Sequence, residues 1–226
     1  MTAPVPVGDR LAPAAGLVVL VHGLWMGAPA CALLAGRLRA RGLHVVSFPY
    51  RSVKHTLEET AERLFRFVTG LGTAPAHFVG HSLGGLVVLA TLARHPALSA
   101  ARVVLLGSPA NGCEAAAQLQ RSAHGRLLLG AALPSWKPEW ARDVTRRLEV
   151  GAIAGDRRFG LGMLFVRLDG ENDGVVGVEE TRLPGLRDHL VLPVTHTGML
   201  VSGRVAGQVA AFLAGGHFVR QPQPSL

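Results

Sequence analysis

Lysine is almost missing from this chain of 226 residues: Lys54 and Lys137 are its two lysines, and the other basic residues are arginines. The 23 basic residues exceed the 15 acidic ones, which gives a formal net charge of +8. The arginines are spread along the chain without a block of like charges, and no recognised nucleic-acid-binding motif accompanies them. We therefore expect no nucleic-acid partner despite the basic balance.

Cysteine is scarce too, with Cys31 and Cys113 in neither a C-x-x-C pair nor a metal-ligand spacing. The sequence therefore predicts no disulfide framework and no metal site. Residues 1–16 hold two early prolines and an acidic residue, without the basic start and apolar core of a signal peptide. No apolar run reaches the length of a membrane span. We expect a cytoplasmic protein without a transmembrane segment.

Short β-branched runs alternate with longer helical patterns along the chain, as in α/β proteins built on a parallel sheet. The strand candidates are almost continuously apolar, which indicates burial on both faces. They are Gly16–Val21, His44–Phe48, Ala76–Val79, Arg102–Leu106, Val150–Ala154 and His189–Val194. The helix candidates are Ala30–Arg41, Leu57–Thr69, Leu86–His95 and Met199–Leu213. The length suits one domain over residues 1–226, with a core at 14–215 and a tail at 216–226.

The interval 109–149 breaks this alternation, because it is longer than an ordinary connection between a strand and the next element. It holds a possible helix over Cys113–Leu129 and a charged segment over Glu139–Arg147. Insertions of this length often serve as lids or binding loops. The alternative is one sheet-packing helix followed by a surface helix, and both interpretations stay open.

The stretch Gly80-His81-Ser82-Leu83-Gly84 matches the pattern G-x-S-x-G at the junction of a predicted strand and a predicted helix. Glycine two residues before and after Ser82 removes the side chains that would collide in a turn sharp enough to expose the hydroxyl. The start of the following helix also directs free N–H groups towards the serine. This setting makes Ser82 the candidate nucleophile, whereas the adjacent His81 is interpreted as structural.

A second signal, "HGLWMG" from His22 to Gly27, directly follows the first predicted strand. A tight loop there can direct the N–H of Leu24 to the same point as the N–H of Leu83. Two such donors form an oxyanion hole, worth about 3 kcal/mol per donor to the transition state. The alternative for this stretch is an ordinary β-turn.

A base and an acid are needed to activate the serine. His196 lies between the last predicted strand and the last helix, at the carboxyl edge of the sheet where Ser82 lies. Asp173 begins a turn that returns to packed structure, so its carboxylate can be held rigidly, as the acid of a catalytic triad requires. We favour Asp173 as the acid over Asp156 and Asp169.

Four motifs, "VHGLWMG", "GHSLGG", "NDGVV" and "THTGML", occur in this order, and with them the chain resembles the α/β-hydrolase superfamily, most closely its compact bacterial lipases and esterases. The resemblance spans Gly16 to about Leu213. It implies an α/β-hydrolase fold in which Ser82 is the nucleophile, Asp173 the acid and His196 the base. It assigns the oxyanion donors to Leu24 and Leu83 and implies no cofactor. The usual first edge strands are absent, so we expect a minimal, mostly parallel sheet of about six strands with a small cap.

The resemblance implies hydrolysis of a small-molecule carboxylic ester through an acyl-enzyme. We expect Trp25, Met26 and Trp136 to line an apolar acyl site, together with Trp140 and leucines of the insertion; the alternative is that most of these leucines are core. Those leucines are Leu127, Leu128, Leu129 and Leu133. Thioester hydrolysis, acyl transfer, cofactor-free peroxide chemistry and non-catalytic binding of a lipid or partner are the alternatives, whereas haloalkane dehalogenation would require an aspartate in place of Ser82.

Overall fold

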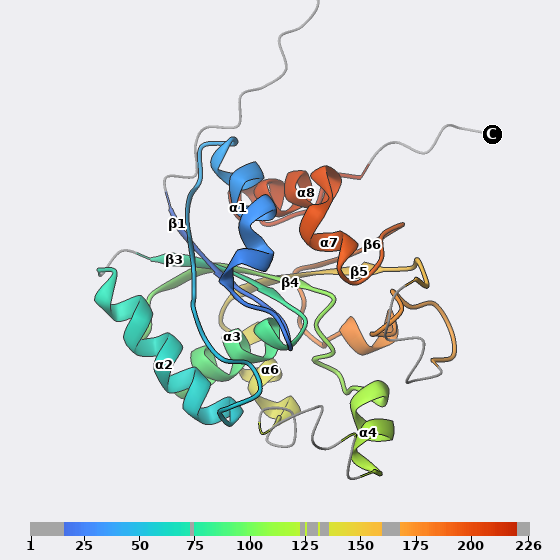
Figure 1. Ribbon diagram of the computed structural model, residues 1–226. Helices are drawn as coiled ribbons and strands as arrows, with labels where there is room; N and C mark the ends of the chain where they lie inside the picture. The colour runs from blue at the N-terminus through green and yellow to red at the C-terminus, as the bar shows by residue number, and fades with distance from the viewer. Residues whose placement is uncertain are drawn as a thin grey trace, which may run out of the picture.

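The computed structural model describes residues 16–72, 75–122, 125, 131, 136–159 and 168–220. Its centre is a six-stranded sheet in the order β2-β1-β3-β4-β5-β6, and all neighbouring strands run parallel (Figure 1). The strands are β1 (Leu17–Val21), β2 (His44–Ser47), β3 (Ala76–His81), β4 (Ala100–Leu106), β5 (Glu149–Gly155) and β6 (Asp188–Leu192). The predicted α/β fold with a sheet of about six parallel strands is confirmed.

Helices cover both faces of the sheet (Figure 1). One face carries α2 (Leu57–Gly70), α3 (Leu83–Arg94) and α6 (Pro138–Thr145), and the other carries α1 (Ala32–Arg39), α7 (Gly198–Val201) and α8 (Gly203–Gly215). In the described part of the chain, two short 3-10 helices, η1 (Ala28–Cys31) and η4 (Glu179–Thr181), lie in connections. The buried side chains form two hydrophobic clusters, one beneath each helical layer. The sheet is therefore the middle layer of three, which explains why its strands are almost continuously apolar.

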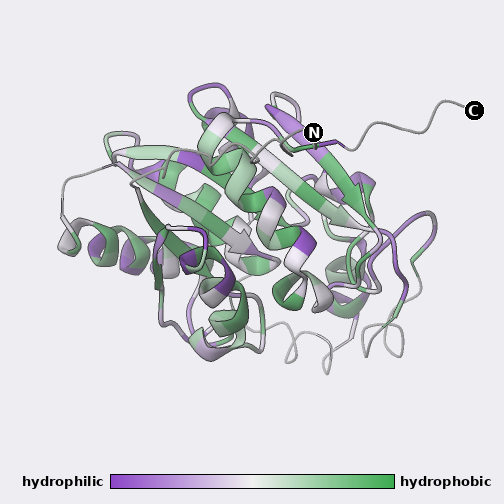
Figure 2. Ribbon diagram, turned by 90° about the horizontal axis from the view of Figure 1, so that it is seen from above, coloured by the Kyte–Doolittle hydropathy of each residue, from purple (hydrophilic) through white to green (hydrophobic). Residues whose placement is uncertain are grey.

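Helix α2 shows how the sequence pattern sets an outer helix. Thr56 and Glu59 form a reciprocal capping box at its start, with Glu59 N–H donating to Thr56 Oγ1 at 3.1 Å and Thr56 N–H to Glu59 Oε2 at 3.0 Å. Hydrophobic and hydrophilic residues alternate along the helix (Figure 2), and residues such as Leu57, Leu64 and Val68 are buried in the hydrophobic cluster that α2 shares with α3. Its bounds agree with the predicted helix within one residue.

The other helices differ from the prediction in informative ways. Helix α3 begins at Leu83, three residues before the predicted start, so the glycines after Ser82 belong to its first turn. The predicted helix Met199–Leu213 is interrupted at Ser202, where the backbone is extended. The Ser202 side chain caps α8, because its Oγ accepts the N–H of Val205 at 3.2 Å.

The interval 109–149 contributes two described helices. Helix α4 (Glu114–Gln120) stands away from the two helical layers, while α6 packs on α3 (Figure 1). The rest of the predicted helix Cys113–Leu129 falls largely outside the described residues. Within the described part of the chain, no helix is long and apolar enough to cross a membrane.

The close approach of α3 to β1 fixes the carboxyl edge of the sheet. A Cβ added at Gly84 would lie 2.1 Å from the carbonyl oxygen of Val21 and 2.5 Å from that of His22. Because both obstacles are backbone atoms of a central strand and its loop, no side-chain rotation can relieve them. Gly84 is therefore required by packing rather than by its backbone conformation.

We predict that Gly84→Ala lowers the free energy of unfolding by at least about 2 kcal/mol, because it forces α3 away from β1. Gly36→Ala is the matched control, since Gly36 lies on an exposed side of α1 with nothing within 4 Å of the added Cβ. It should raise stability by about 0.5–1 kcal/mol through helix propensity. Urea unfolding of both variants makes the comparison, and equal stability of the two variants would contradict this account.

Candidate active site

Ser82 occupies a sharp turn between β3 and α3. Its backbone dihedrals are φ 54° and ψ −124°, a strained conformation for a residue with a side chain, costing on the order of 1–3 kcal/mol. Although Ser82 is the N-cap residue of α3, its hydroxyl makes no capping hydrogen bond. Its N–H donates to the carbonyl of Leu106 at 2.8 Å. The backbone is thus anchored to β4 while the hydroxyl remains available at a cavity.

The loop after β1 lies against this turn. A Cβ added at Gly23 would be 3.0 Å from the Cβ of Ser82, so the loop passes directly beside the serine. Tyr50 holds the base of the loop by donating its hydroxyl to the carbonyl of His22 at 2.7 Å and by stacking on the His22 ring. The loop ends in Trp25, whose φ is 60° and whose N–H donates to Ser52 Oγ at 3.0 Å.

Leu24 and Leu83 lie at the same cavity as the serine. Leu83 is the first residue of α3, where N–H groups have no partner within the helix. Among the described residues, neither N–H has a hydrogen-bond acceptor. Both N–H groups thus lack a partner in the described part of the chain, and their role as oxyanion donors stays a prediction.

Asp173 and His196 are in contact behind the cavity. Asp173 Oδ2 lies 2.7 Å from His196 Nδ1, and both side chains are buried. The other carboxylate oxygen accepts the N–H groups of Val175 at 3.0 Å and Val176 at 2.8 Å. The N–H of His196 donates to the carbonyl of Asp173 at 3.0 Å. With these contacts the carboxylate orients the imidazole and fixes Nδ1 as the protonated nitrogen.

Two glycines at strand ends make room for this pair. A Cβ at Gly107 would lie 3.0 Å from Asp173 Oδ2 and 3.1 Å from His196 Nδ1, and the φ of Gly107 is 53°. A Cβ at Gly155 would lie 2.9 Å from the Cβ of Asp173. The sequence analysis did not single out either residue. A signal was available, because Gly107 directly follows an apolar strand and Gly155 ends one.

His81 supports His196 from the other side. Its Nε2 lies 3.0 Å from the carbonyl oxygen of His196, so Nε2 carries the proton and donates. Burial lowers the pKa of His81 to about 3, and the nearby imidazole of His196 adds to this effect. The ring is therefore neutral at physiological pH.

Ser82, Leu24, Leu83, Trp25, Met26 and His196 line one cavity of about 510 Å³. The remaining walls are mostly apolar and come from the segment into and along α4, from the turn after Asp173 and from residue 159. These residues are Pro109, Cys113, Ala115, Ala116, Leu119, Phe159, Val175 and Val176, and Gly23, His81, Thr195 and Thr197 complete the described lining. No charged side chain is found among the described lining residues, so the cavity suits an uncharged, apolar group.

Cys113 is a second nucleophilic group in the cavity. Burial raises the pKa of its thiol to about 12, and its Sγ accepts the N–H of Ala116 at 3.4 Å. Since the thiolate is the reactive form of cysteine, this thiol is unreactive near neutral pH. Ser82 is therefore the better candidate nucleophile of the two.

Some predicted residues lie elsewhere. The structure does not bring Trp136 to this cavity: its ring meets Trp140 edge-on at 5.9 Å, and both pack against the hydrophobic cluster under α3. Asp156 is exposed beside Arg157, and Asp169 lines a different pocket. The insertion leucines at 127–129 and 133 lie outside the described residues. The α4 residues Ala115, Ala116 and Leu119, which do line the cavity, were missed because small and apolar side chains there carry no chemical signature.

Among the described residues, no cluster of three or more histidine, cysteine, aspartate or glutamate side chains is arranged to hold a metal ion. Cys31 and Cys113 are both free thiols, the first buried and the second half-buried. The described titratable residues near Ser82 are thus Asp173 and three histidines, His22, His81 and His196, together with the Cys113 thiol.

Comparison with known proteins identifies the family of this chain. Residues 18–224 match the model of the alpha/beta hydrolase family, and the chain belongs to that family. Among solved structures, a lipase of Bacillus licheniformis, BlEst2 in mature form, superposes with a TM-score of 0.70 at 21% identity, covering 93% of this chain and 94% of that one. A metagenomic carboxyl esterase gives a TM-score of 0.65 at 19% identity, covering 93% and 78%.

A thioesterase domain from the curacin biosynthetic pathway gives a TM-score of 0.60 at 14% identity, covering 89% of this chain and 92% of that domain. A search of curated proteins found no match. At these identities the solved structures show a shared fold, and the chemistry must be argued from the site.

The buried neutral state of His81 predicts a pH-dependent stability. In the unfolded chain a histidine binds a proton near pH 6.5, whereas folded His81 does so only near pH 3. The unfolded state therefore binds more protons below pH 6.5, so stability is retained above that value and falls as the pH decreases towards 3. Urea unfolding of wild type and His81→Gln at pH 7 and pH 5 tests this.

Wild type should lose more stability between these pH values than His81→Gln does, by on the order of 1–2 kcal/mol. Both proteins share the other buried histidines, so the difference isolates His81. An equal loss in both proteins would show that folded His81 is already protonated at pH 5, as it is in the unfolded chain.

Proposed function

We propose that the protein is a serine hydrolase that cleaves carboxylic esters of uncharged, apolar acids through an acyl-enzyme on Ser82. The observation that carries this proposal is the contact between Asp173 and His196 at 2.7 Å beside a cavity that Ser82 and His196 both line. The strained backbone of Ser82 and its uncapped hydroxyl support the same assignment, because strain of this kind is maintained where function requires it.

In the proposed reaction, Ser82 Oγ attacks the ester carbonyl and transfers its proton to His196 Nε2. Asp173 accepts the hydrogen bond from Nδ1–H and stabilises the imidazolium that forms. The carbonyl oxygen becomes an oxyanion and accepts hydrogen bonds from the N–H groups of Leu24 and Leu83. When the intermediate collapses, His196 returns the proton to the leaving alkoxide, and an alcohol departs.

The second half repeats these steps with water. A water molecule gives a proton to His196 Nε2 and attacks the acyl carbonyl, and the oxyanion again binds Leu24 and Leu83. Collapse releases the carboxylic acid while the proton returns to Ser82. Trp25 and Met26, together with the α4 wall, form the acyl-binding surface in this proposal. The mechanism uses side chains and backbone groups of this chain and water alone.

The triad assignment predicts distinct effects of three substitutions on hydrolysis of nitrophenyl esters. Ser82→Ala should lower kcat by at least about 10³-fold, because the oxyanion donors and the cavity remain but the nucleophile is lost. Asp173→Asn should lower kcat by about 10⁴-fold, since the amide no longer holds the required tautomer of His196. Asp156→Asn, a matched change at an exposed aspartate, should leave kcat near the wild-type value.

Circular dichroism and urea unfolding confirm that each variant is folded before rates are compared. Turnover that survives in Ser82→Ala would exclude the acyl-enzyme. Loss of activity in Asp156→Asn, with Asp173→Asn fully active, would overturn the choice of acid.

The uncharged cavity predicts discrimination between acyl groups of similar size. Nitrophenyl butyrate should be hydrolysed with a kcat/KM at least about tenfold above that of the mono-nitrophenyl ester of succinic acid. The reason is that the succinyl carboxylate would lose its hydration without a cation among the described lining residues. The thioester of butyric acid, run in parallel, tests the alternative of thioesterase activity. Preference for the succinyl ester would contradict the proposed substrate class.

A further inference from the structure

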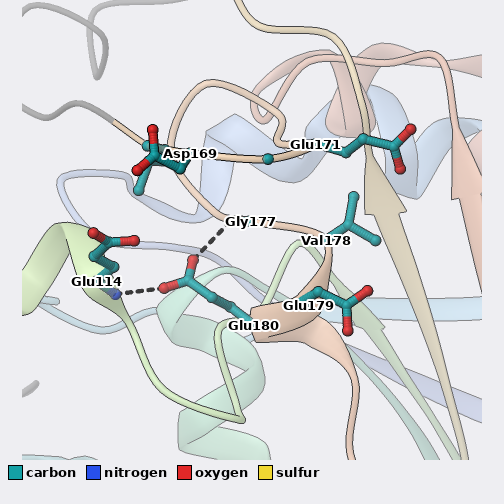
Figure 3. Close-up of a pocket in the computed structure, with 9 residues that line it drawn as sticks. Glu114, Asp169, Glu171, Gly177, Val178, Glu179 and Glu180 are labelled. Carbon is teal, nitrogen blue, oxygen red and sulfur yellow. Dashed lines mark hydrogen bonds between the residues drawn. The ribbon is translucent and has the colours of Figure 1, made fainter.

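Glu180 joins two segments that meet beside the cavity. Its Oε2 accepts the N–H of Gly177 at 2.7 Å, and its Oε1 accepts the N–H of Glu114 (Figure 3). Gly177 lies on the turn after Asp173, and Glu114 is the first residue of α4. A single carboxylate on η4 thus tethers the start of α4 to the turn that carries the candidate acid.

A backbone contact reinforces the same junction. The N–H of Asn111 donates to the carbonyl of Glu180 at 2.9 Å. Asn111 lies in the segment that leads from β4 into α4. Both the entry to α4 and its first residue are therefore hydrogen-bonded to Glu180, one through the main chain and one through the side chain.

On one side of this tether, α4 forms a wall of the cavity. Ala115, Ala116 and Leu119 line the cavity with Ser82 and His196, and α4 stands apart from the helices that cover the sheet (Figure 1). The position of its first turn, which the N–H of Glu114 helps to fix, therefore sets the width of the apolar space opposite the serine.

On the other side, the turn after Asp173 holds the carboxylate. Val175 and Val176 donate their N–H groups to Asp173 Oδ1, and Gly177 is the next residue. Holding the N–H of Gly177 limits the movement of both donors. The hydrogen bonds of Val175 and Val176 hold Asp173 Oδ1 themselves, so the direct effect of Glu180 is on Gly177 and on the start of α4.

The Glu180 carboxylate is partly buried among other acidic side chains, so its ionised form needs hydrogen-bond donors. Burial raises the pKa of Glu180, while the two N–H donors act in the opposite direction. The pocket around it is lined by other carboxylates, from Glu114, Asp169, Glu171 and Glu179, and no lysine or arginine is found among the described lining residues (Figure 3). Backbone N–H groups, rather than a cation, thus stabilise the ionised form.

We propose that Glu180 is a positioning residue that locks α4 to the turn after Asp173 and so sets the acyl space of the cavity. This inference rests on the proposed ester hydrolysis for its kinetic consequence, but the tether itself can be tested without any substrate. Loss of the tether should widen or disorder the α4 wall, which affects binding of long acyl groups more than attack on short ones.

Hydrogen–deuterium exchange tests the tether directly. In Glu180→Gln one oxygen acceptor remains, and in Glu180→Met neither does, while side-chain length is kept. Exchange of peptides covering α4 and residues 174–178 should accelerate by about tenfold in Glu180→Gln and more in Glu180→Met, with the central strands unchanged. The control Glu179→Gln removes the neighbouring charge at an exposed position and should exchange like wild type. Unchanged exchange in Glu180→Met would overturn the proposal.

Kinetics test the consequence for the site. For nitrophenyl octanoate, Glu180→Met should raise KM by about fivefold to tenfold relative to wild type, and Glu180→Gln should give an intermediate value. For nitrophenyl acetate, kcat/KM should fall by less than about threefold. An equal loss on both esters would show a general structural effect and contradict the positioning role.

The two measurements separate the possible failures. If wild type hydrolyses none of the esters while α4 exchange still depends on Glu180, the proposed function fails and the tether stands. If wild type is active and the Glu180 variants match Glu179→Gln in both exchange and chain-length preference, the tether fails and the proposed function stands.

Discussion

The close packing of backbone against backbone at the carboxyl edge of the sheet is the constraint on which the rest of the structure depends. Ser82 can adopt its left-handed turn only because its glycine neighbours leave space for α3 to lie on β1. A Cβ at Gly80 would lie 2.5 Å from the Cα of Gly85, and a Cβ at Gly84 would meet the carbonyl of Val21. Gly107 has a similar role, because a side chain there would collide with the candidate acid and base. Because glycine has no Cβ, these backbone segments can approach closely enough to form the candidate site.

Around this edge, polar groups are held by backbone N–H donors rather than by cations. Asp173 is fixed by the turn that follows it, and Glu180 is fixed by the same turn and by α4. The cavity itself contains no charged side chain among its described walls. This separation places the ionised groups behind the cavity, where they orient other groups without presenting a charge to the substrate.

Much of this arrangement was predictable from the sequence, because it depends on local patterns. The six strands follow from apolar runs, and Ser82 and His196 from their positions at strand ends. The start of α3 was placed too late because Gly84 and Gly85 are poor helix formers, yet the tertiary packing on β1 requires glycine there. The break at Ser202 had a local signal, a serine followed by glycine, that the apolar periodicity concealed.

Other features depend on contacts between distant segments, which periodicity does not encode. Trp136 and Leu119 come from the same insertion and are both apolar, but the first packs under α3 and the second lines the cavity. Glu180 lies in a run of charged residues that resembles a solvated surface. Its contact with Glu114, 66 positions earlier in the chain, depends on the fold and has no local signal.

The most direct test of the central claim is covalent labelling of the protein by a small alkyl fluorophosphonate, followed by intact mass measurement and peptide mapping. The account predicts one adduct per chain, located on Ser82, with the labelling rate strongly reduced in His196→Gln and Asp173→Asn. Because the Cys113 thiol is protonated, it should carry no adduct. Labelling that is absent in wild type, or that occurs at another residue with Ser82 unmodified, would contradict the claim that Ser82 is the activated nucleophile.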